Sequence, residues 1–492
     1  MQTVLQKRWF CVTCLAIAVF LPVLCGVLEM AVGVEPDDSS VFRYMGWRMT
    51  VGGGHCYIDA WDHKGPVVYL FNALGFLICP CGTKGTTLVF SLLWVGSILL
   101  AYRFLKAQDK SGTAAVCSLL LSFFAIGNGT GRFLDSQEAI GVFFACLGVN
   151  ILFSRERKWN HFLFGVAVGC SFMAKASMVA FGGAAIAFWL FDLYSTRDVK
   201  LFLGRCGFAF LGFSAALALL TLAFLPNGVK PMWDAAFLYN LFEYHQSDIS
   251  WVEWWQRFFQ DRPNGASGWW QLPLFGLLLG AAAVSLIRNR EGVDRRLRFY
   301  MTVFLVFECI IAFMMKTFYS HYLVLAYVPL AIVLALNVGK GFNFAFWSSA
   351  VALCFFSVGI VSGLCYARMR TLSTDKTVTW IKGNLDPSEP IAVFGSTSVA
   401  EVLCQCGMKT PQRHFCTRLY LDDAKSARKA LMIEELEQAL NDCRYFLADF
   451  SIYDIKRSNV PEELKGVFHL LYSYDIIWES PPYRVYRNSK RY

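Results

Sequence analysis

A run of ionisable side chains follows the first apolar segment of the chain and is the part of the sequence best suited to chemistry. It combines carboxylates, an imidazole and an ammonium within residues 37–64. Its members are Asp37, Asp38, Asp59, Asp62, His63 and Lys64. Charged groups are costly to hold near hydrocarbon, so a membrane protein that gathers them usually uses them. Carboxylates can act as bases and cations can hold a phosphate, which together suit chemistry on a phosphorylated lipid.

Asp38 is expected to open a short helix, with Arg43 and Arg48 directed away from the apolar face of that helix. Asp is strongly preferred as a helix N-cap, so Asp37 or Asp38 has a purely structural explanation as the cap. The two roles are compatible, because a capping loop places the neighbouring side chain rigidly.

The segment Asp62–Pro66 allows two interpretations. A solvated turn before a helix accounts for Gly65 and Pro66, since Pro is favoured in the first helical turn. It does not account for the polar residues between Trp61 and the apolar run that follows. A helix start with His63 and Lys64 beside its backbone N–H groups would make an anion site. We favour this second interpretation, because ionisable groups at membrane depth are functional by default.

Composition assigns the chain to the polytopic membrane proteins. Of its 492 residues, 56% are hydrophobic and 16% are charged, against about 25% charged in soluble domains. The net charge of +9 does not indicate nucleic acid as a partner, because the basic residues are scattered through short loops and form no stripe.

Windows of about 19 apolar residues predict about eleven membrane-spanning helices. The predicted spans are 10–34, 86–104, 113–127, 138–154, 161–174, 177–193, 203–225, 269–287, 299–315, 321–337 and 343–366. The positive-inside rule then places the N-terminus in the cytoplasm. With this orientation, basic clusters such as 155–158 and 288–298 are cytoplasmic, whereas the short outer loops hold one basic residue each, Arg132 and Lys316.

Three regions face outward in this topology. Loop 35–85 carries the ionisable cluster and is expected to be catalytic. Loop 226–268 is rich in Trp and Tyr and is expected to form interfacial helices. The tail, 367–492, follows the membrane domain, 1–366. It reads as a small α/β domain, with strands at 390–395, 445–448, 468–478 and 483–487 and a helix over 422–443.

Further polar residues fall on the same predicted outer face. They are Glu138, Lys175, Lys316, His321 and Tyr322. Ordinary explanations exist: Glu138 suits a helix N-terminus, and a lone Lys such as Lys175 reaches for the interface. Their gathering on one face, in a topology derived from other residues, favours a shared site.

The motifs resemble those of a known family. Asp-Asp-Ser-Ser-Val-Phe (37–42) and Tyr-Ile-Asp-Ala-Trp-Asp-His-Lys-Gly-Pro (57–66) resemble the first outer loop of GT-C type glycosyltransferases, above all bacterial members of glycosyltransferase family 39, relatives of the protein O-mannosyltransferases and of the lipid A aminoarabinose transferase. Gly-Cys-Ser-Phe-Met-Ala-Lys (169–175) and Tyr-Ser-His-Tyr (319–322) resemble later landmarks of the family. The resemblance covers roughly residues 1–340.

The resemblance implies a sugar donor linked to polyprenyl phosphate. Asp38 occupies the place of the family's base or acceptor-orienting acid, although Ser39 stands where relatives carry Glu, which leaves the choice between Asp37 and Asp38 open. His63 and Lys64 occupy the place of cationic or metal-associated residues beside the donor phosphate, with Lys175, His321 and Tyr322 as further candidates.

Further expectations follow from the same resemblance. It implies an inverting transfer to a glycan, lipid or protein acceptor on the outer face of a bacterial inner membrane. Some relatives need a divalent metal ion and others do not, and no dense ligand set in this sequence decides between them. Asp59, Asp62, Glu138 and Lys316 are additional site candidates.

Two alternatives to an enzyme would also account for parts of this sequence. A transporter or flippase would also have many helices and a few buried charges, but such proteins favour midplane polar sites and internal repeats. No repeat is evident here. A non-catalytic envelope-assembly protein would tolerate neutralisation of the carboxylates in the first loop.

Overall fold

The structure is a computed structural model of the 492-residue chain. It describes residues 8–32, 38–80, 82–108, 110–126, 136–154, 156–243, 295–314, 324–337, 374–417, 426–449 and 462–489, with a few single positions between 250 and 287. The predicted span 343–366 lies outside these residues, and so does nearly all of 269–287.

The chain divides into two compact units, each made of three stretches of sequence. Unit 1 comprises Met1–Leu28, Phe90–Thr221 and Asp248–Cys365. Unit 2 comprises Glu29–Val89, Leu222–Ser247 and Tyr366–Tyr492. The first predicted loop and the tail thus belong to one unit. The predicted boundary at residue 366 stays a prediction about membrane topology.

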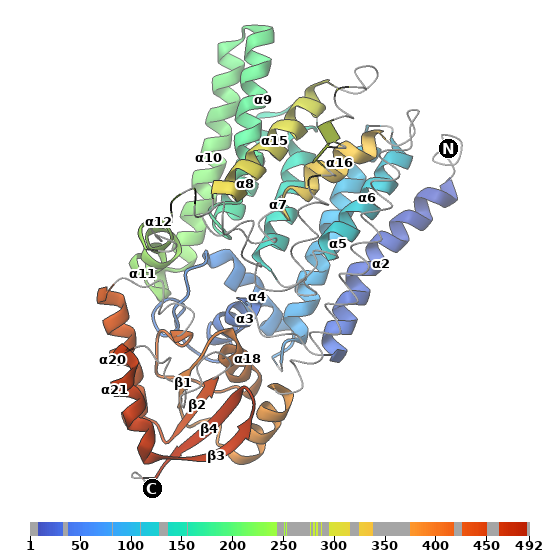
Figure 1. The fold of residues 1–492 in the computed structure, drawn as a ribbon. Helices are drawn as coiled ribbons and strands as arrows, with labels where there is room; N and C mark the ends of the chain where they lie inside the picture. The colour runs from blue at the N-terminus through green and yellow to red at the C-terminus, as the bar shows by residue number, and fades with distance from the viewer. Residues whose placement is uncertain are drawn as a thin grey trace. The chain divides into compact units, whose positions relative to one another are not determined.

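Unit 1 is helical, and its helices run alongside one another in Figure 1. Those lying wholly or mostly in it are α2 (Arg8–Val32), α5 (Lys84–Lys106), α6 (Ser111–Ile126), α7 (Gln137–Leu152), α8 (Lys158–Phe172), α9 (Ala180–Thr196), α10 (Val199–Ala223), α15 (Arg295–Met314) and α16 (Tyr327–Asn337). Every predicted span that lies largely within the described residues coincides with one of these helices. Three helices of the described part are long and apolar enough to cross a membrane: Arg8–Ala31, Lys84–Lys106 and Val199–Ala223. The total of about eleven spans stays a prediction.

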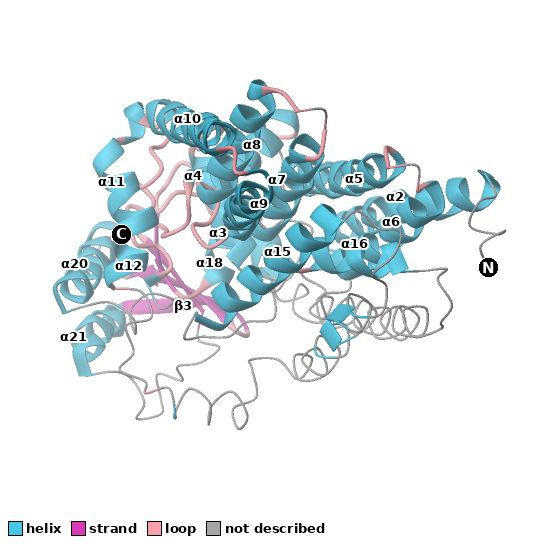
Figure 2. Cartoon of the chain, turned by 90° about the horizontal axis from the view of Figure 1, so that it is seen from above, coloured by secondary structure: helices cyan, strands magenta, loops and turns pink. Residues whose placement is uncertain are grey.

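Unit 2 contains a four-stranded sheet in the order β1-β2-β4-β3. The strands are β1 (Ile391–Phe394), β2 (Tyr445–Asp449), β3 (Tyr474–Ser480) and β4 (Tyr483–Asn488). β1 and β2 are parallel and fully buried, and the other neighbouring pairs are antiparallel. Helices α20 (Ser426–Asp442) and α21 (Glu462–Leu470) lie along the sheet, as Figures 1 and 2 show.

The strands expected at 390–395, 445–448 and 483–487 are confirmed. The helix expected over 422–443 is confirmed from Ser426 to Asp442. The strand expected over 468–478 is wrong in its first half. Residues up to Ser473 are helical, because the apolar spacing there continues the helix that begins at Glu462.

Two short helices of the first loop pack in unit 2, α3 (Asp38–Arg48) and α4 (Pro66–Ile78). Their close approach depends on Gly46, where an added Cβ would lie 2.6 Å from the Cβ of Asn72. Helix α3 also packs on α18 (Thr397–Cys406) of the tail. A helical stretch, α11 (Val229–Trp233), η2 (Asp234–Tyr239) and α12 (Asn240–Phe242), completes the surroundings of the loop.

Candidate functional site

The turn before α4 is built by its own backbone. Tyr57 adopts a positive φ of 66°, and its N–H donates to the carbonyl of Ala60 at 2.8 Å. The carbonyl of His55 accepts from the N–H groups of Ile58 and Asp59. Gly65 is the N-cap residue of α4 and supplies no side-chain cap. The helix begins at Pro66, as predicted, and the backbone N–H groups of the residues after this proline lie at its start.

Asp62, His63 and Lys64 form a continuous chain of polar contacts, which we call the Asp62–Lys64 chain. Tyr69 donates its hydroxyl to Oδ2 of Asp62 at 2.6 Å, and Oδ1 of Asp62 lies 3.3 Å from Nδ1 of His63. Nε2 of His63 contacts Nζ of Lys64. Asp62 and His63 are buried, with 1% and 3% of their surface exposed, whereas Lys64 is half-buried. The ammonium is thus the more accessible end of this chain.

Electrostatics keep the imidazole neutral. Burial lowers the pKa of His63, and the charge of Lys64 lowers it further. The carboxylates of Asp62 and Asp38 act in the opposite direction without reversing the shift. A neutral imidazole carries one N–H donor and one acceptor nitrogen, so Nδ1–H can donate to Asp62 while Nε2 accepts from the Lys64 ammonium.

Aromatic rings and an amide enclose this chain. The Trp61 ring meets the Tyr239 ring edge to face at 4.9 Å, and the His63 ring lies 5.6 Å from Tyr239. The hydroxyl of Tyr57 donates to the carbonyl of Lys64 at 2.8 Å. Asn240 donates to the carbonyl of His63 at 2.6 Å. The backbone of the turn is therefore held by hydrogen bonds from its own loop and from the 229–242 helical stretch.

Asp38 is the first residue of α3, and its side chain is exposed, whereas every later residue of the helix is buried. Its charge acts to raise the pKa of the His63 imidazole. An exposed carboxylate on the first residue of a buried helix suits the role of a base, and the held Lys64 ammonium suits that of an anion site.

Arg43 and Arg48, expected to point away from the apolar face of α3, are nevertheless buried, as is every residue of the helix after Asp38. Arg43 is fully buried and donates to Glu401 of α18 at 2.8 Å and to Oγ of Ser40 at 3.1 Å. Glu401 also accepts from the amide of Gln405 at 2.7 Å. A carboxylate supplied by the tail makes burial of this guanidinium possible, because buried charges are retained when they are paired.

The tail contacts Trp61, the residue that precedes the Asp62–Lys64 chain. The N–H of Trp61 donates to the carbonyl of Arg413 at 2.8 Å, and the His414 ring lies 5.0 Å from the Trp61 ring. Arg428 of α20 lies over the Trp61 and Tyr239 rings, at 5.0 and 4.9 Å. Bonds of 2.9 and 3.1 Å to the carboxylate of Glu243 fix its guanidinium.

Asp59 has a local role in the turn. Its carboxylate accepts from the N–H of His55 at 2.7 Å and lies 3.7 Å from the guanidinium of Arg48. These contacts close the loop that presents the Asp62–Lys64 chain. Part of any effect of changing Asp59 is therefore structural.

Other sequence candidates lie in unit 1. Lys175 pairs with Glu138 at 2.8 Å, and both residues line a small cavity with the buried Glu308 of α15. The ammonium of Lys175 thus has a carboxylate partner, and its assignment to a phosphate stays a prediction. Asp37, Lys316, His321 and Tyr322 lie outside the described residues.

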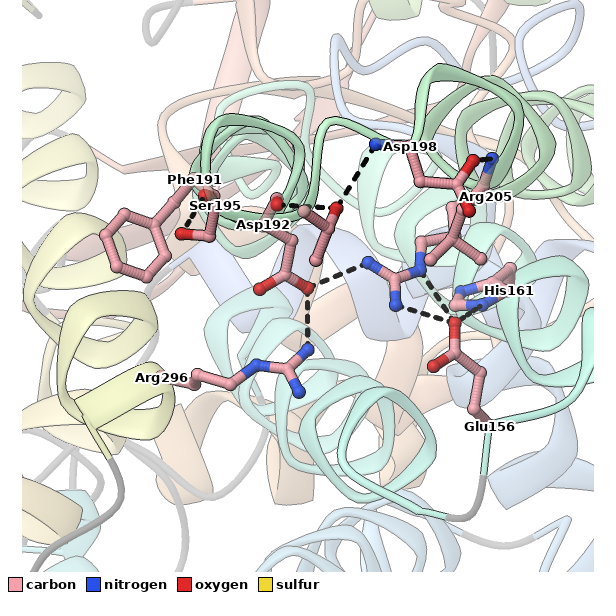
Figure 3. A network of polar contacts seen from close by, with 10 residues as sticks. Glu156, His161, Phe191, Asp192, Ser195, Asp198, Arg205 and Arg296 are labelled. Carbon is pink, nitrogen blue, oxygen red and sulfur yellow. Dashed lines mark hydrogen bonds and ion pairs between the residues drawn. The ribbon is translucent and has the colours of Figure 1, made fainter.

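A second ionic network in unit 1 ties its helices together (Figure 3). Arg205 of α10 bonds Glu156 at 2.6 Å and Asp192 of α9 at 2.8 Å, and Arg296 of α15 reaches the same Asp192 carboxylate at 2.6 Å. In the predicted topology these ends are cytoplasmic, so we interpret the network as structural.

Sequence reasoning missed several residues that shape the site: Asn240, Tyr57, Tyr69, Glu401 and Arg428. Only Tyr57 and Tyr69 carried a signal, since they flank the polar turn. The other three come from segments far along the chain. Within the described residues, no group of three or more His, Cys, Asp or Glu side chains could hold a metal ion.

Comparison with known proteins places the fold. No family profile matches the sequence, and no curated protein does either. Among solved structures, ArnT from Cupriavidus metallidurans bound to undecaprenyl phosphate matches with a TM-score of 0.64 at 10% identity, covering 98% of each chain. The chain has the GT-C fold.

Two further matches accompany the first. The apo structure of the same ArnT has a TM-score of 0.60 at 10% identity and covers 95% of this chain and 97% of that one. The oligosaccharyltransferase of Archaeoglobus fulgidus has a TM-score of 0.47 at 12% identity and covers 90% of this chain and 69% of that one. The GT-C fold predicted from the first loop is confirmed, and at these identities the similarity concerns fold alone.

Proposed function

We propose that this protein is a membrane glycosyltransferase, which moves a sugar from a polyprenyl-phosphate-linked donor to a lipid, glycan or protein acceptor with inversion at the anomeric carbon. One observation carries the proposal: unit 2 holds the Lys64 ammonium against buried His63, and the exposed carboxylate of Asp38 acts on the pKa of that imidazole. The GT-C fold supports it, since a protein of that fold, ArnT, binds undecaprenyl phosphate.

The reaction is a single displacement. A hydroxyl of the acceptor attacks the anomeric carbon while Asp38 takes its proton. The new carbon–oxygen bond forms as the bond to the donor phosphate breaks, and that bonding pair leaves with polyprenyl phosphate. The proton then passes from Asp38 to water or to the released phosphate. A positioned base of this kind typically contributes about 10²–10⁴-fold.

Lys64 assists departure of the phosphate. A phosphodiester with one negative charge becomes a monoester with up to two, so a held cation gains interaction energy as the bond breaks. The backbone N–H groups at the start of α4 add to the same field.

The topology belongs to the same proposal. About eleven spans with a cytoplasmic N-terminus place the first loop and the tail on the extracytoplasmic face of a bacterial inner membrane, where a lipid-linked donor meets an envelope acceptor. Asp37 could share the role of Asp38, and Lys175, His321 and Tyr322 could contact the donor phosphate after it enters from the lipid.

The test is turnover of a defined donor. The purified full chain in lipid nanodiscs is given polyprenyl-phosphate sugars with an envelope extract as acceptor, and release of polyprenyl phosphate is measured. Asp38→Asn and Lys64→Ala are expected to lose most turnover while keeping the wild-type melting temperature. Asp475→Asn and Lys382→Ala, which change exposed residues of the tail, are matched controls expected to retain it. Equal rates in all four variants would overturn the proposal.

A further inference from the structure

His63 is placed to act through Lys64 and not on the phosphate itself. Its side chain is 3% exposed, and both ring nitrogens face protein groups, Nδ1 toward Asp62 and Nε2 toward Lys64. The ring packs near Trp61 and Tyr239, and Asn240 holds its carbonyl. An imidazole so enclosed is poorly placed to touch a lipid headgroup.

We propose that Asp62 and His63 are positioning residues: Asp62 holds the neutral imidazole as the Nδ1–H tautomer, and Nε2 accepts a hydrogen bond that aims the Lys64 ammonium at the donor phosphate. The inference rests on the proposed function. It changes the role of His63 from phosphate ligand to acceptor for the lysine, and it gives Asp62 a role through the imidazole.

The chemistry requires this order of donors and acceptors. An ammonium has only donors, so the ring nitrogen that meets it must carry a lone pair. The remaining ring nitrogen then carries the proton and faces a carboxylate, which is the usual way in which a partner fixes a histidine tautomer. Tyr69 donates to the other oxygen of Asp62 at 2.6 Å and so fixes the orientation of the carboxylate.

Substitutions at His63 separate positioning from packing. His63→Gln keeps an acceptor near the Nε2 position, whereas His63→Phe keeps the ring and removes the acceptor. We expect His63→Phe to lower kcat about 10–100-fold, since small misplacements of a catalytic group have effects of this size. His63→Gln should recover most of that loss. His469→Gln, an exposed change on α21, is the control. If His63→Phe and His63→Gln both keep wild-type stability and lose kcat equally, the proposal is overturned.

The pH profile adds a readout that a packing role would not change. The charged groups that act on the pKa of the imidazole are Lys64, Asp62 and Asp38, and the Tyr239 ring lies 5.6 Å from the imidazole ring. Protonation of His63 removes the acceptor, so kcat/KM should fall on an acid limb below pH ~6.5, the ordinary histidine value. Because Asp62 raises the pKa of His63, Asp62→Asn should move this limb to lower pH, and His63→Gln should abolish it.

A measurement on the resting protein separates failure of this inference from failure of the proposed function. The ¹⁵N spectrum of the histidine rings in the full chain, with His63 assigned by its absence in His63→Gln, reports the tautomer without any donor. A neutral Nδ1–H ring at pH 7 is expected, with an Nε2 shift that changes in Lys64→Met. An Nε2–H tautomer or an imidazolium would overturn the inference, whatever the turnover assay shows.

Discussion

Arg43 and Glu401 form an ion pair of 2.8 Å in which neither side chain has any exposed surface. Arg43 lies on α3, five positions after Asp38, and Glu401 lies on α18 of the tail. The helix that begins with the proposed base is therefore fixed by a residue from the other end of the chain. This pair links the tail to the proposed chemistry without requiring the tail to touch a substrate.

Removing one member of this pair should be costly. Glu401→Leu leaves a buried guanidinium without its carboxylate, and losses of about 3–5 kcal/mol are typical of such changes. The double variant Arg43→Met/Glu401→Leu removes both charges and should recover much of the loss. Thermal unfolding in detergent measures both. A single variant as stable as the wild type would show that the buried pair contributes little.

Gly46 should tolerate no side chain. A Cβ there would lie 2.6 Å from Asn72 Cβ and 2.7 Å from the backbone N of Ala73, so Gly46→Ala must separate α3 from α4. Overpacking of this kind costs about 1–3 kcal/mol, and it should also lower turnover because α3 carries Asp38. At Gly383 an added Cβ meets nothing within 4 Å, so Gly383→Ala is the control. Wild-type stability and turnover in Gly46→Ala would contradict the packing.

Acid should destabilise unit 2 through His414 and Glu435. Burial lowers the pKa of His414. Burial by itself raises the pKa of Glu435, but hydrogen bonds from the ring and backbone N–H of His414 outweigh it and lower that pKa. Both groups therefore bind protons more readily when unfolded, and the stability they supply is lost as pH falls.

For His414 this loss should begin below pH ~6.5, the ordinary histidine value, and for Glu435 it should begin nearer pH ~4.3. Melting temperatures of the wild type and of His414→Phe, measured from pH 8 to pH 5, check the first step. The variant should have a flatter profile over that interval. Parallel profiles would show that protonation of His414 does not contribute.

Asp38→Asn should separate chemistry from folding. The side chain is exposed, so the change should alter the free energy of unfolding by no more than about 0.5 kcal/mol. Turnover should fall by about 10²–10⁴-fold, the usual contribution of a general base. Single-turnover rates with saturating donor measure the loss. A fall of less than twofold would remove Asp38 from the base role.

Local pattern predicted much of this fold. The apolar segments predicted at 86–104 and 203–225 lie in α5 and α10. A long apolar run can be recognised as a helix from its own residues, because its length and composition are local properties. The buried strand at 391–394 followed from a short apolar run that ends at a turn. The error at 468–473 arose where helix and strand periodicities overlap within a few residues.

In the candidate site too, only the residues marked by the local sequence could be predicted. Asp62, His63 and Lys64 were recognisable because they are adjacent polar residues in an apolar setting. Asn240, Glu401 and Arg428 were not, because their contacts to this turn and to α3 arise from tertiary packing between segments more than a hundred residues apart in sequence. The burial of Arg43 likewise becomes intelligible only with Glu401 in place.

Lys64 is proposed to hold the phosphate of a polyprenyl carrier, and a binding titration checks this role without any turnover. Titration of the full chain in nanodiscs with undecaprenyl phosphate, followed by ³¹P NMR, gives Kd without any need for the correct sugar or acceptor. Loss of a charge-assisted hydrogen bond of about 1.5–3 kcal/mol predicts a Kd about tenfold to a hundredfold weaker in Lys64→Ala. Lys382→Ala should bind as the wild type does. Equal Kd values for the wild type and Lys64→Ala would show that Lys64 does not hold the phosphate.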